Sequence, residues 1–212
     1  MLLDEPMGAM DPKIKREFRY ELRKIVKDQG VTAVHVTHDQ EEAMVISDRI
    51  AVMRRGRIMQ VGTPLELYYR PNSIFVANFL GEIDFLDGFC VEKRKEGCVV
   101  EVRGGLLLET SDSRREKGER LVVGIRRENL RIELGKKRGH NRLPGRVKRS
   151  VFVGPYVRHH IDLENGYTIA VKEPSRMAHP VSPDEEVTTS FHPRDALVFE
   201  YPENWIDEIA LE

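Results

Sequence analysis

Four side chains near the start of the sequence are of the types that nucleotide chemistry uses. Asp4 and Glu5 follow a short apolar run, Asp11 closes the turn-forming segment PMGAMD, and His38 ends the segment VTAVHVTH. A hydrated Mg²⁺ takes a hard oxygen ligand from a carboxylate, and a second carboxylate can polarise an attacking water. An acidic pair before proline is also common wherever a strand runs into a loop. The pair alone therefore leaves a structural and a chemical interpretation open.

Two predicted strands carry most of these residues. The first strand ends at Asp4. Residues 31–36 form a nearly continuous apolar run, which is typical of a parallel strand that is buried on both faces. His38 follows the second strand, so the carboxylates and the imidazole each stand at a strand end.

A helix is predicted between the two strands. Asp11 is a natural N-cap, Pro12 suits the first helical position and Gly30 suits the C-terminal end. Apolar residues recur between these limits at spacings of four, four and three: Ile14, Phe18, Leu22 and Ile25. A right-handed β-α-β crossover puts both strand ends on one edge of the sheet, so we expect Asp4, Glu5 and His38 to converge there.

These motifs together resemble a known family. LLDEP, GAMD, VTHDQEEAM and DRIAVMRRGRIMQVGTPLELYYRP look like the second half of the nucleotide-binding subunit of an ABC transporter, in the branch that serves bacterial importers of sugars, polyamines, iron and other small solutes. The resemblance implies that Asp4 is the Walker B aspartate that holds Mg²⁺ and that Glu5 is the general base. It implies that Asp11 belongs to the D-loop, which reaches a partner subunit, and that His38 senses the γ-phosphate.

The sequence also departs from this family's pattern. It contains no GxxxxGK[ST] phosphate loop, no LSGGQ-type signature and no glutamine loop, all of which precede the Walker B strand in the family. Without a ring of backbone N–H groups and a lysine around the phosphates, this chain is not expected to bind ATP tightly or to hydrolyse it alone. Mg-ATP is expected as the cofactor of a longer parent subunit, of which this chain is interpreted as the C-terminal part.

Short helices and a hairpin complete the expected first domain, residues 1–81. A helix is predicted over 39–46, a hairpin turns at Gly56, and Thr63, Pro64 and Glu66 spell an N-cap, an N1 proline and a capping box. A further helix over 73–80 is expected to stop at Gly81. The fold class expected for this part is an α/β fragment of a P-loop-type ATPase core.

Residues 82–212 are predicted to form a second, all-β domain. Ten short strands are expected at 85–91, 98–102, 106–110, 121–125, 130–132, 145–153, 159–163, 167–171, 186–191 and 196–199. Strands of this length and spacing favour a small barrel or sandwich. The segments VGIRRENLRI and SFHPRDALVFE resemble the accessory OB-like domain of the same subunits, the transport-associated OB (TOBE) domain. Arg127 replaces the proline of that family's GIRPE segment.

Composition and residue spacing argue against two other classes of function, nucleic-acid binding and metal binding. The net charge is −1 and aromatic residues are nearly absent from the basic stretch 93–149, so nucleic-acid binding is not expected. Neighbouring His159 and His160 point to opposite faces of a strand, and the other histidines of the second domain are isolated, which argues against a metal site there. Cys90 and Cys98 are expected to be free, half-buried thiols.

The resemblance also implies partners and a location. It implies a homodimer, permease subunits that span the membrane, and a cytoplasmic position on the inner face of the membrane. An independent OB-type domain that binds a sugar, an oxyanion or, less favoured, nucleic acid is the alternative. The transported substrate cannot be read from the chain, although FLGEIDFLDG faintly resembles polyamine-importer subunits.

Overall fold

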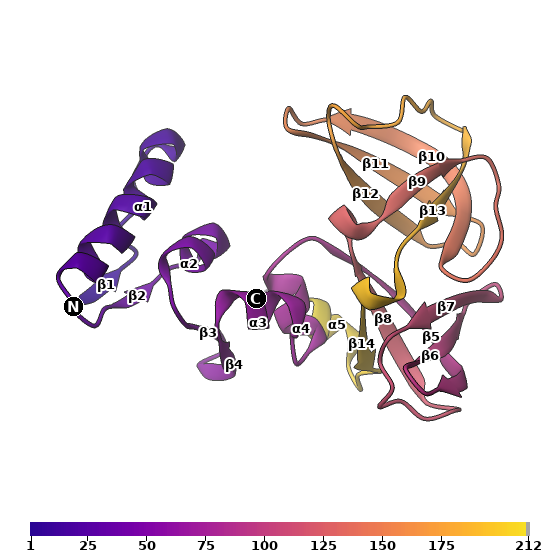
Figure 1. Ribbon diagram of the computed structural model, residues 1–212, viewed down its shortest axis with the longest axis horizontal. Coiled ribbons are helices and arrows are strands. Elements are labelled where there is room, and N and C mark those ends of the chain that lie inside the picture. Colours follow the sequence, from indigo (N-terminus) through magenta and orange to yellow (C-terminus); the bar gives the residue numbers. More distant parts are fainter. Residues whose placement is uncertain (211–212) are drawn as a thin grey trace. The chain divides into compact units, whose positions relative to one another are not determined.

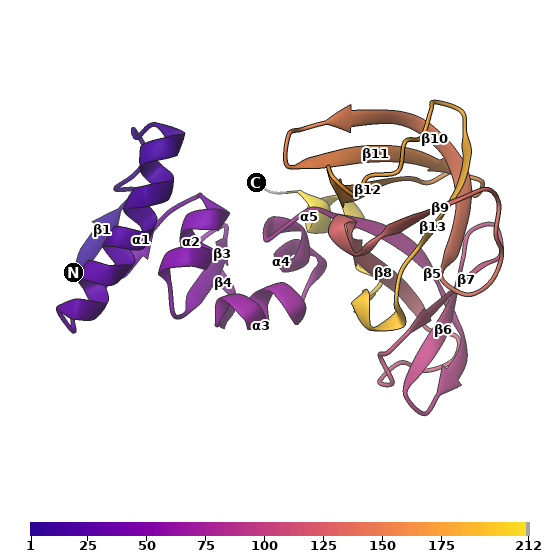
Figure 2. The ribbon, with the colours of Figure 1, turned by 45° about the horizontal axis from the view of Figure 1, so that its top comes forward.

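The computed structural model describes residues 1–210, in two compact units, Met1–Asn72 and Ser73–Ala210 (Figures 1 and 2). The second unit starts at helix α4 (Ile74–Phe79), whereas the sequence favoured a boundary after Gly81. Residues 211 and 212, the end of the expected second domain, lie outside the described residues.

The first unit begins with the expected β-α-β element. Strand β1 (Leu2–Asp4) pairs in parallel with β2 (Val34–Val36), and α1 (Pro12–Asp28) joins them. The Asp11 side chain caps α1 by accepting a hydrogen bond from the Lys13 N–H at 2.9 Å. Gly30 has a φ of +62°, a conformation that glycine adopts at little cost. The limits of this helix follow from local chemistry.

Burial of the second strand on both faces was predicted and is wrong. Val34 is 56% and Val36 is 53% exposed. The parallel sheet within residues 1–72 has two strands, so too few neighbours cover the apolar run. The expected α/β core of P-loop type is therefore represented by this one β-α-β element, and the described chain as a whole is mostly β-sheet.

The rest of the first unit follows the local signals. Helix α2 (Gln40–Ile46) is capped by Asp39, and strands β3 (Ile50–Arg54) and β4 (Arg57–Gly62) form a hairpin with Gly56 in its turn. Helix α3 (Pro64–Tyr69) has both reciprocal hydrogen bonds of the predicted capping box.

The second unit contains the ten predicted strands in two antiparallel sheets. One has the order β14-β8-β5-β6-β7 and the other β12-β11-β10-β13-β9. The bounds are β5 (Ile83–Arg94), β6 (Gly97–Val102), β7 (Leu106–Thr110), β8 (Arg120–Arg126), β9 (Arg131–Leu134), β10 (Arg142–Phe152), β11 (Tyr156–Leu163), β12 (Thr168–Pro174), β13 (Glu186–Ser190) and β14 (Ala196–Glu200). Short 3₁₀ turns, Arg127–Asn129 and Pro193–Asp195, precede β9 and β14.

One apolar core serves both sheets. It includes Leu86 and Val123 from the first sheet and Leu143 and Ile161 from the second, all at most 1% exposed. The two sheets thus depend on each other for burial, as expected for layers packed around one core. Within the second sheet, Gly145 lies where β10 meets β11, and a Cβ there would come within 2.6 Å of the Asp162 carbonyl oxygen.

The chain end packs back onto the start of the second unit. In helix α5 (Trp205–Ile209) the Ile209 carbonyl accepts a hydrogen bond from Asn78 of α4 at 2.9 Å. The Trp205 ring lies edge-on to Phe85 at 6.0 Å and stacked on Tyr201 at 6.2 Å. Trp205 therefore packs within this unit.

The cysteines and the adjacent histidines of the second unit differ in burial. Cys90 and Cys98 are buried and free. His159 is buried while His160 is partly exposed, as the alternation of a strand predicts. None of the helices within residues 1–210 is long and apolar enough to cross a membrane.

Candidate functional site

Glu5 and His38 lie side by side at the strand ends of the first unit. The distance from Glu5 Oε1 to His38 Nδ1 is 3.2 Å, and both side chains are more than half exposed. The contact arises because β1 and β2 run in parallel, which puts their C-terminal ends at one edge. A carboxylate oriented by an imidazole is a suitable general base toward a water molecule.

The backbone of Glu5 adopts an unusual conformation. Its φ is +42°, in the left-handed region that residues with a Cβ rarely adopt, and its N–H donates to the Val36 carbonyl at 2.9 Å. Such strain persists only where surrounding contacts enforce it, and it is concentrated at functional sites. The turn therefore directs this carboxylate toward His38 at a cost in backbone energy.

The other two predicted site residues occupy different positions. Asp4 is the last residue of β1, pairs with Val36 and is exposed. Asp11 caps α1, and its carboxylate accepts from Lys13. The structure thus brings Glu5 and His38 together, leaves Asp4 as the sequence neighbour of Glu5, and gives Asp11 a capping contact.

A group of charged residues beside His38 was not predicted as part of the site. Lys15 and Arg19 of α1 contact the start of α2: Lys15 Nζ lies 2.6 Å from Glu42 and 3.0 Å from Asp39. Hydrogen bonds to Glu42 and Asp39 raise the pKa of Lys15. Burial alone would raise the pKa of Asp39, but hydrogen bonds from the Glu42 N–H and from Lys15 lower it overall. The only sequence signal was the four-residue spacing of Lys15 and Arg19, which places both on one helix face.

The donor atoms of this region suit part of a magnesium-nucleotide site. Asp4 and Glu5 offer carboxylate oxygens, which are the ligand type that Mg²⁺ prefers. Over residues 1–210, however, no cluster of three or more His, Cys, Asp or Glu side chains could hold a metal ion by itself. Asp4 and Glu5 could therefore supply only part of the ligand set of a Mg²⁺.

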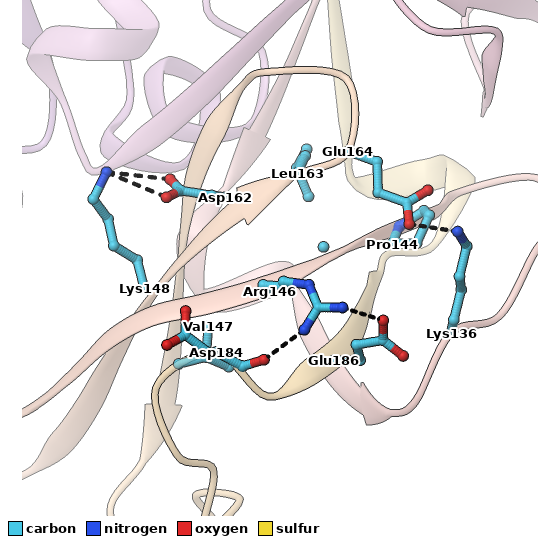
Figure 3. A pocket seen from close by; sticks show the side chains of 11 residues that line it. Lys136, Pro144, Arg146, Val147, Lys148, Asp162, Leu163, Glu164, Asp184 and Glu186 are labelled. Atoms are coloured by element: carbon cyan, nitrogen blue, oxygen red, sulfur yellow. Dashed lines mark hydrogen bonds and ion pairs between the residues drawn. The ribbon is translucent and has the colours of Figure 1, made fainter.

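The second unit has a pocket on its β10–β11–β13 surface. Figure 3 shows Arg146 between the Asp184 carbonyl, at 2.9 Å, and the Glu186 carboxylate. The charged lining residues are three cations and four acids: Lys136, Arg146, Lys148, Asp162, Glu164, Asp184 and Glu186. Each cation is paired with an acid of the same pocket, so the site has no free positive charge among these residues.

Comparisons with known proteins decide the family. Residues 123–199 match the TOBE domain family. The spermidine/putrescine import ATP-binding protein PotA of Thermotoga maritima is 36% identical over 208 residues, which cover 94% of this chain and 56% of the relative. The chain corresponds to the C-terminal part of an ABC importer ATP-binding subunit and carries a TOBE domain.

Further relatives agree. PotA of Rubrobacter xylanophilus is 35% identical over 93% of this chain and 53% of its own length, and PotA of Clostridioides difficile is 42% identical over 78% and 45%. The chain spans about half the length of the curated relatives it matches.

A solved structure shares the β fold. The crystal structure of ModG, described as a cytoplasmic molybdate-binding protein, superposes with a TM-score of 0.50 and 12% identity over 56% of this chain and 96% of ModG. At this identity the likeness concerns the fold alone, and it supports the OB-like architecture expected for the second unit.

The structure gives a reason for the arginine that replaces the proline of the GIRPE segment. Arg127, in place of the proline, lies in the 3₁₀ turn before β9, and its guanidinium bonds Asp84 of β5 at 3.0 Å. Asp84 in turn accepts from the Ala170 N–H of β12 at 2.8 Å. The arginine therefore contributes to a polar link between the two sheets, which a proline could not make.

Proposed function

We propose that this chain supplies the water-activating half of the ATPase site of a polyamine-type ABC importer, together with a regulatory TOBE domain. The observation that carries the proposal is the Glu5–His38 contact at 3.2 Å on a strained turn. The names of the relatives, spermidine and putrescine import ATP-binding proteins, support the substrate class.

Each residue has a defined role in this proposal. Glu5 accepts the proton of the attacking water, and His38 orients the Glu5 carboxylate and faces the phosphate being transferred. Asp4 holds Mg²⁺, and Asp11 reaches the second subunit. Mg-ATP, when bound in the complete site, supplies the electrophilic γ-phosphate. Permease subunits at the inner face of the membrane and a second copy of the subunit are the proposed partners.

A chimera tests the proposal directly. Residues 1–212 of this chain would replace the matching region of the Thermotoga maritima relative, and ATP hydrolysis would be measured with and without Glu5→Gln. We expect the variant to lose activity by about a hundredfold or more, because removing a catalytic general base costs 10²–10⁴ in rate. Glu17→Gln, an exposed change on α1, is the matched control and should leave hydrolysis unchanged. A folded chimera whose activity survives Glu5→Gln contradicts the proposal.

The alternative of an independent small-ligand domain rests on the ModG likeness. Molybdate is a doubly charged oxyanion, and binding it in the pocket of Figure 3 would require breaking ion pairs among lining residues with an excess of acids. We therefore favour the ATPase-subunit proposal. A thermal-shift titration with molybdate is expected to leave the melting temperature of the second unit unchanged, whereas a concentration-dependent rise would favour the alternative.

A further inference from the structure

The carboxylate of Glu42 is buried at the start of α2. Glu42 is 1% exposed, which is rare for glutamate unless it is paired. Lys15 Nζ lies 2.6 Å from Oε1, and the Thr37 hydroxyl donates to Oε2 at 2.6 Å. His35 Nε2, from β2, lies 3.5 Å from Oε2. A buried charge thus connects α1, β2 and the segment that precedes α2.

The same contacts fix the backbone on both sides of His38. Thr37 Oγ1 accepts a hydrogen bond from the Asp39 N–H at 3.0 Å, and Asp39 Oδ1 accepts from the Glu42 N–H at 3.0 Å. His38 itself has a 74% exposed side chain and would otherwise be free to reorient. The buried Glu42 carboxylate therefore holds Thr37 directly, and Asp39 is held by the Thr37 hydroxyl and by the Glu42 backbone N–H.

Helix α1 supplies the cations of this arrangement. Lys15 and Arg19 are one turn apart, and Arg19 bonds Asp39 at 3.1 Å. Helix α1 follows the Glu5 turn, and α2 follows His38. The ion pairs therefore add a second link, besides the pairing of β1 and β2, between the segments that carry Glu5 and His38.

We propose that Lys15, Thr37 and Glu42 are positioning residues that hold His38 against Glu5. A buried ion pair is poor evidence for a gain in stability, because desolvation offsets much of the attraction, but it can impose one geometry. The inference rests on the proposed function for the roles of Glu5 and His38. Its geometric part does not depend on nucleotide.

NMR on the full chain tests the geometry. The readout is the nuclear Overhauser contact between the His38 ring and the Glu5 side chain. We expect Lys15→Met to remove this contact and Lys15→Arg to restore it. Lys27→Met is the matched control, since Lys27 pairs with Asp48 near the other end of α1. A Lys15→Met chain that keeps both its fold and the Glu5–His38 contact overturns the proposal.

A second variant covers loss of folding. If α1 amide signals disappear in Lys15→Met because Glu42 is left buried and unpaired, Lys15→Met combined with Glu42→Leu removes both charges. We expect this double variant to fold and to lack the Glu5–His38 contact. If it folds and the contact remains, the proposal is wrong.

Hydrolysis by the chimera separates this inference from the proposed function. There Lys15→Met is expected to lower kcat about tenfold or more with little change in KM for ATP, because misplacing a catalytic group slows the chemical step. Loss of the NMR contact with unchanged kcat supports positioning and contradicts the assigned roles of Glu5 and His38. Retention of the contact contradicts positioning and leaves the proposed function to the Glu5→Gln experiment.

Discussion

At the scale of single residues, the backbone conformation of Glu5 costs the first unit free energy and directs the carboxylate toward His38. A φ of +42° costs a residue with a Cβ about 1–2 kcal/mol relative to a right-handed conformation. The exposed Glu5–His38 contact offsets at most part of this cost, since even a fully charged exposed pair contributes at most about 1 kcal/mol. The carboxylate is therefore kept in place by the surrounding fold.

Replacing Glu5 by glycine should relieve this strain. We expect Glu5→Gly to raise the free energy of unfolding of the first unit by about 1 kcal/mol, because glycine adopts positive φ readily. Glu5→Ala removes the same carboxylate but keeps a Cβ, so it should give no such gain. Urea denaturation followed by circular dichroism measures both. Equal stability of the two variants would show that strain at this turn is negligible.

Tyr167 gives the second unit a defined response to alkaline pH. Its hydroxyl donates to Asp87, and burial together with this hydrogen bond raises the pKa of Tyr167 to about 12. A raised pKa in the folded state means that the stabilisation is complete below pH 10 and is lost between about pH 10 and 12. Tyr167→Phe should therefore make the loss of stability over this range less steep than in the parent chain. The free energy of unfolding is measured by urea titration of both chains at pH 8 and pH 11. An equal loss of stability between these two pH values in the two chains would contradict the assignment.

At the scale of elements, α5 joins the chain end to α4 through a few side chains. Trp205 packs on Phe85 and Tyr201, and Asn78 bonds the last turn of the helix. A five-residue helix is too short to be stable in water by itself. These contacts, and not helix propensity, are what order the segment.

Removing the indole should release α5. We expect Trp205→Ala to destabilise the second unit by about 2–4 kcal/mol, somewhat below the usual cost for a fully buried tryptophan, because Trp205 is partly exposed. Hydrogen exchange of the α5 amides should accelerate at the same time. Ile209→Ala, at a 38% exposed position of the same helix, should have a much smaller effect. Unchanged α5 exchange in Trp205→Ala would show that other contacts hold the helix.

At the scale of the whole molecule, the first unit exposes apolar surface on its two-stranded sheet. Leu2 is 84% exposed and faces Val34 across the ladder, and Val36 follows on the same side. Contiguous apolar surface of this kind promotes association in water. We expect the chain to self-associate with rising concentration.

Light scattering with a surface variant checks this expectation. Val34→Ser combined with Val36→Thr should lower the average mass at a given concentration, while Leu65→Ser, at a 70% exposed position on α3 outside this sheet, should not. A parent chain that stays monomeric over the whole concentration range would contradict the prediction.

Much of the local structure was predictable from the sequence. The Asp11 cap, the Thr63 capping box and the Gly56 hairpin depend on residues within about four positions of each other, so their chemistry is visible in the letters. The ten strands of the second unit were likewise marked by alternation and turns. Their limits differ by a few residues because tertiary hydrogen bonds extend them.

The candidate site was predictable in part. The motifs named Glu5 and His38, and the parallel pairing of β1 and β2 brings them into contact, as a β-α-β crossover requires. The left-handed turn at Glu5 and the buried Glu42 with its Lys15 partner carried no comparable signal. In the sequence HDQEEAM, Glu42 is predicted to be an exposed acid in the first turn of a helix. Its burial follows only from the packing of α1 against α2.

The sequence by itself therefore determined the residue types of the site and the local elements that carry them. Only the tertiary structure decided which acid is buried, that α4 belongs with the strands, and that Arg127 links the two sheets through Asp84. Caps, turns and alternation arise from neighbours along the chain, whereas burial, sheet order and ion pairing depend on residues that are distant in sequence and meet only after folding.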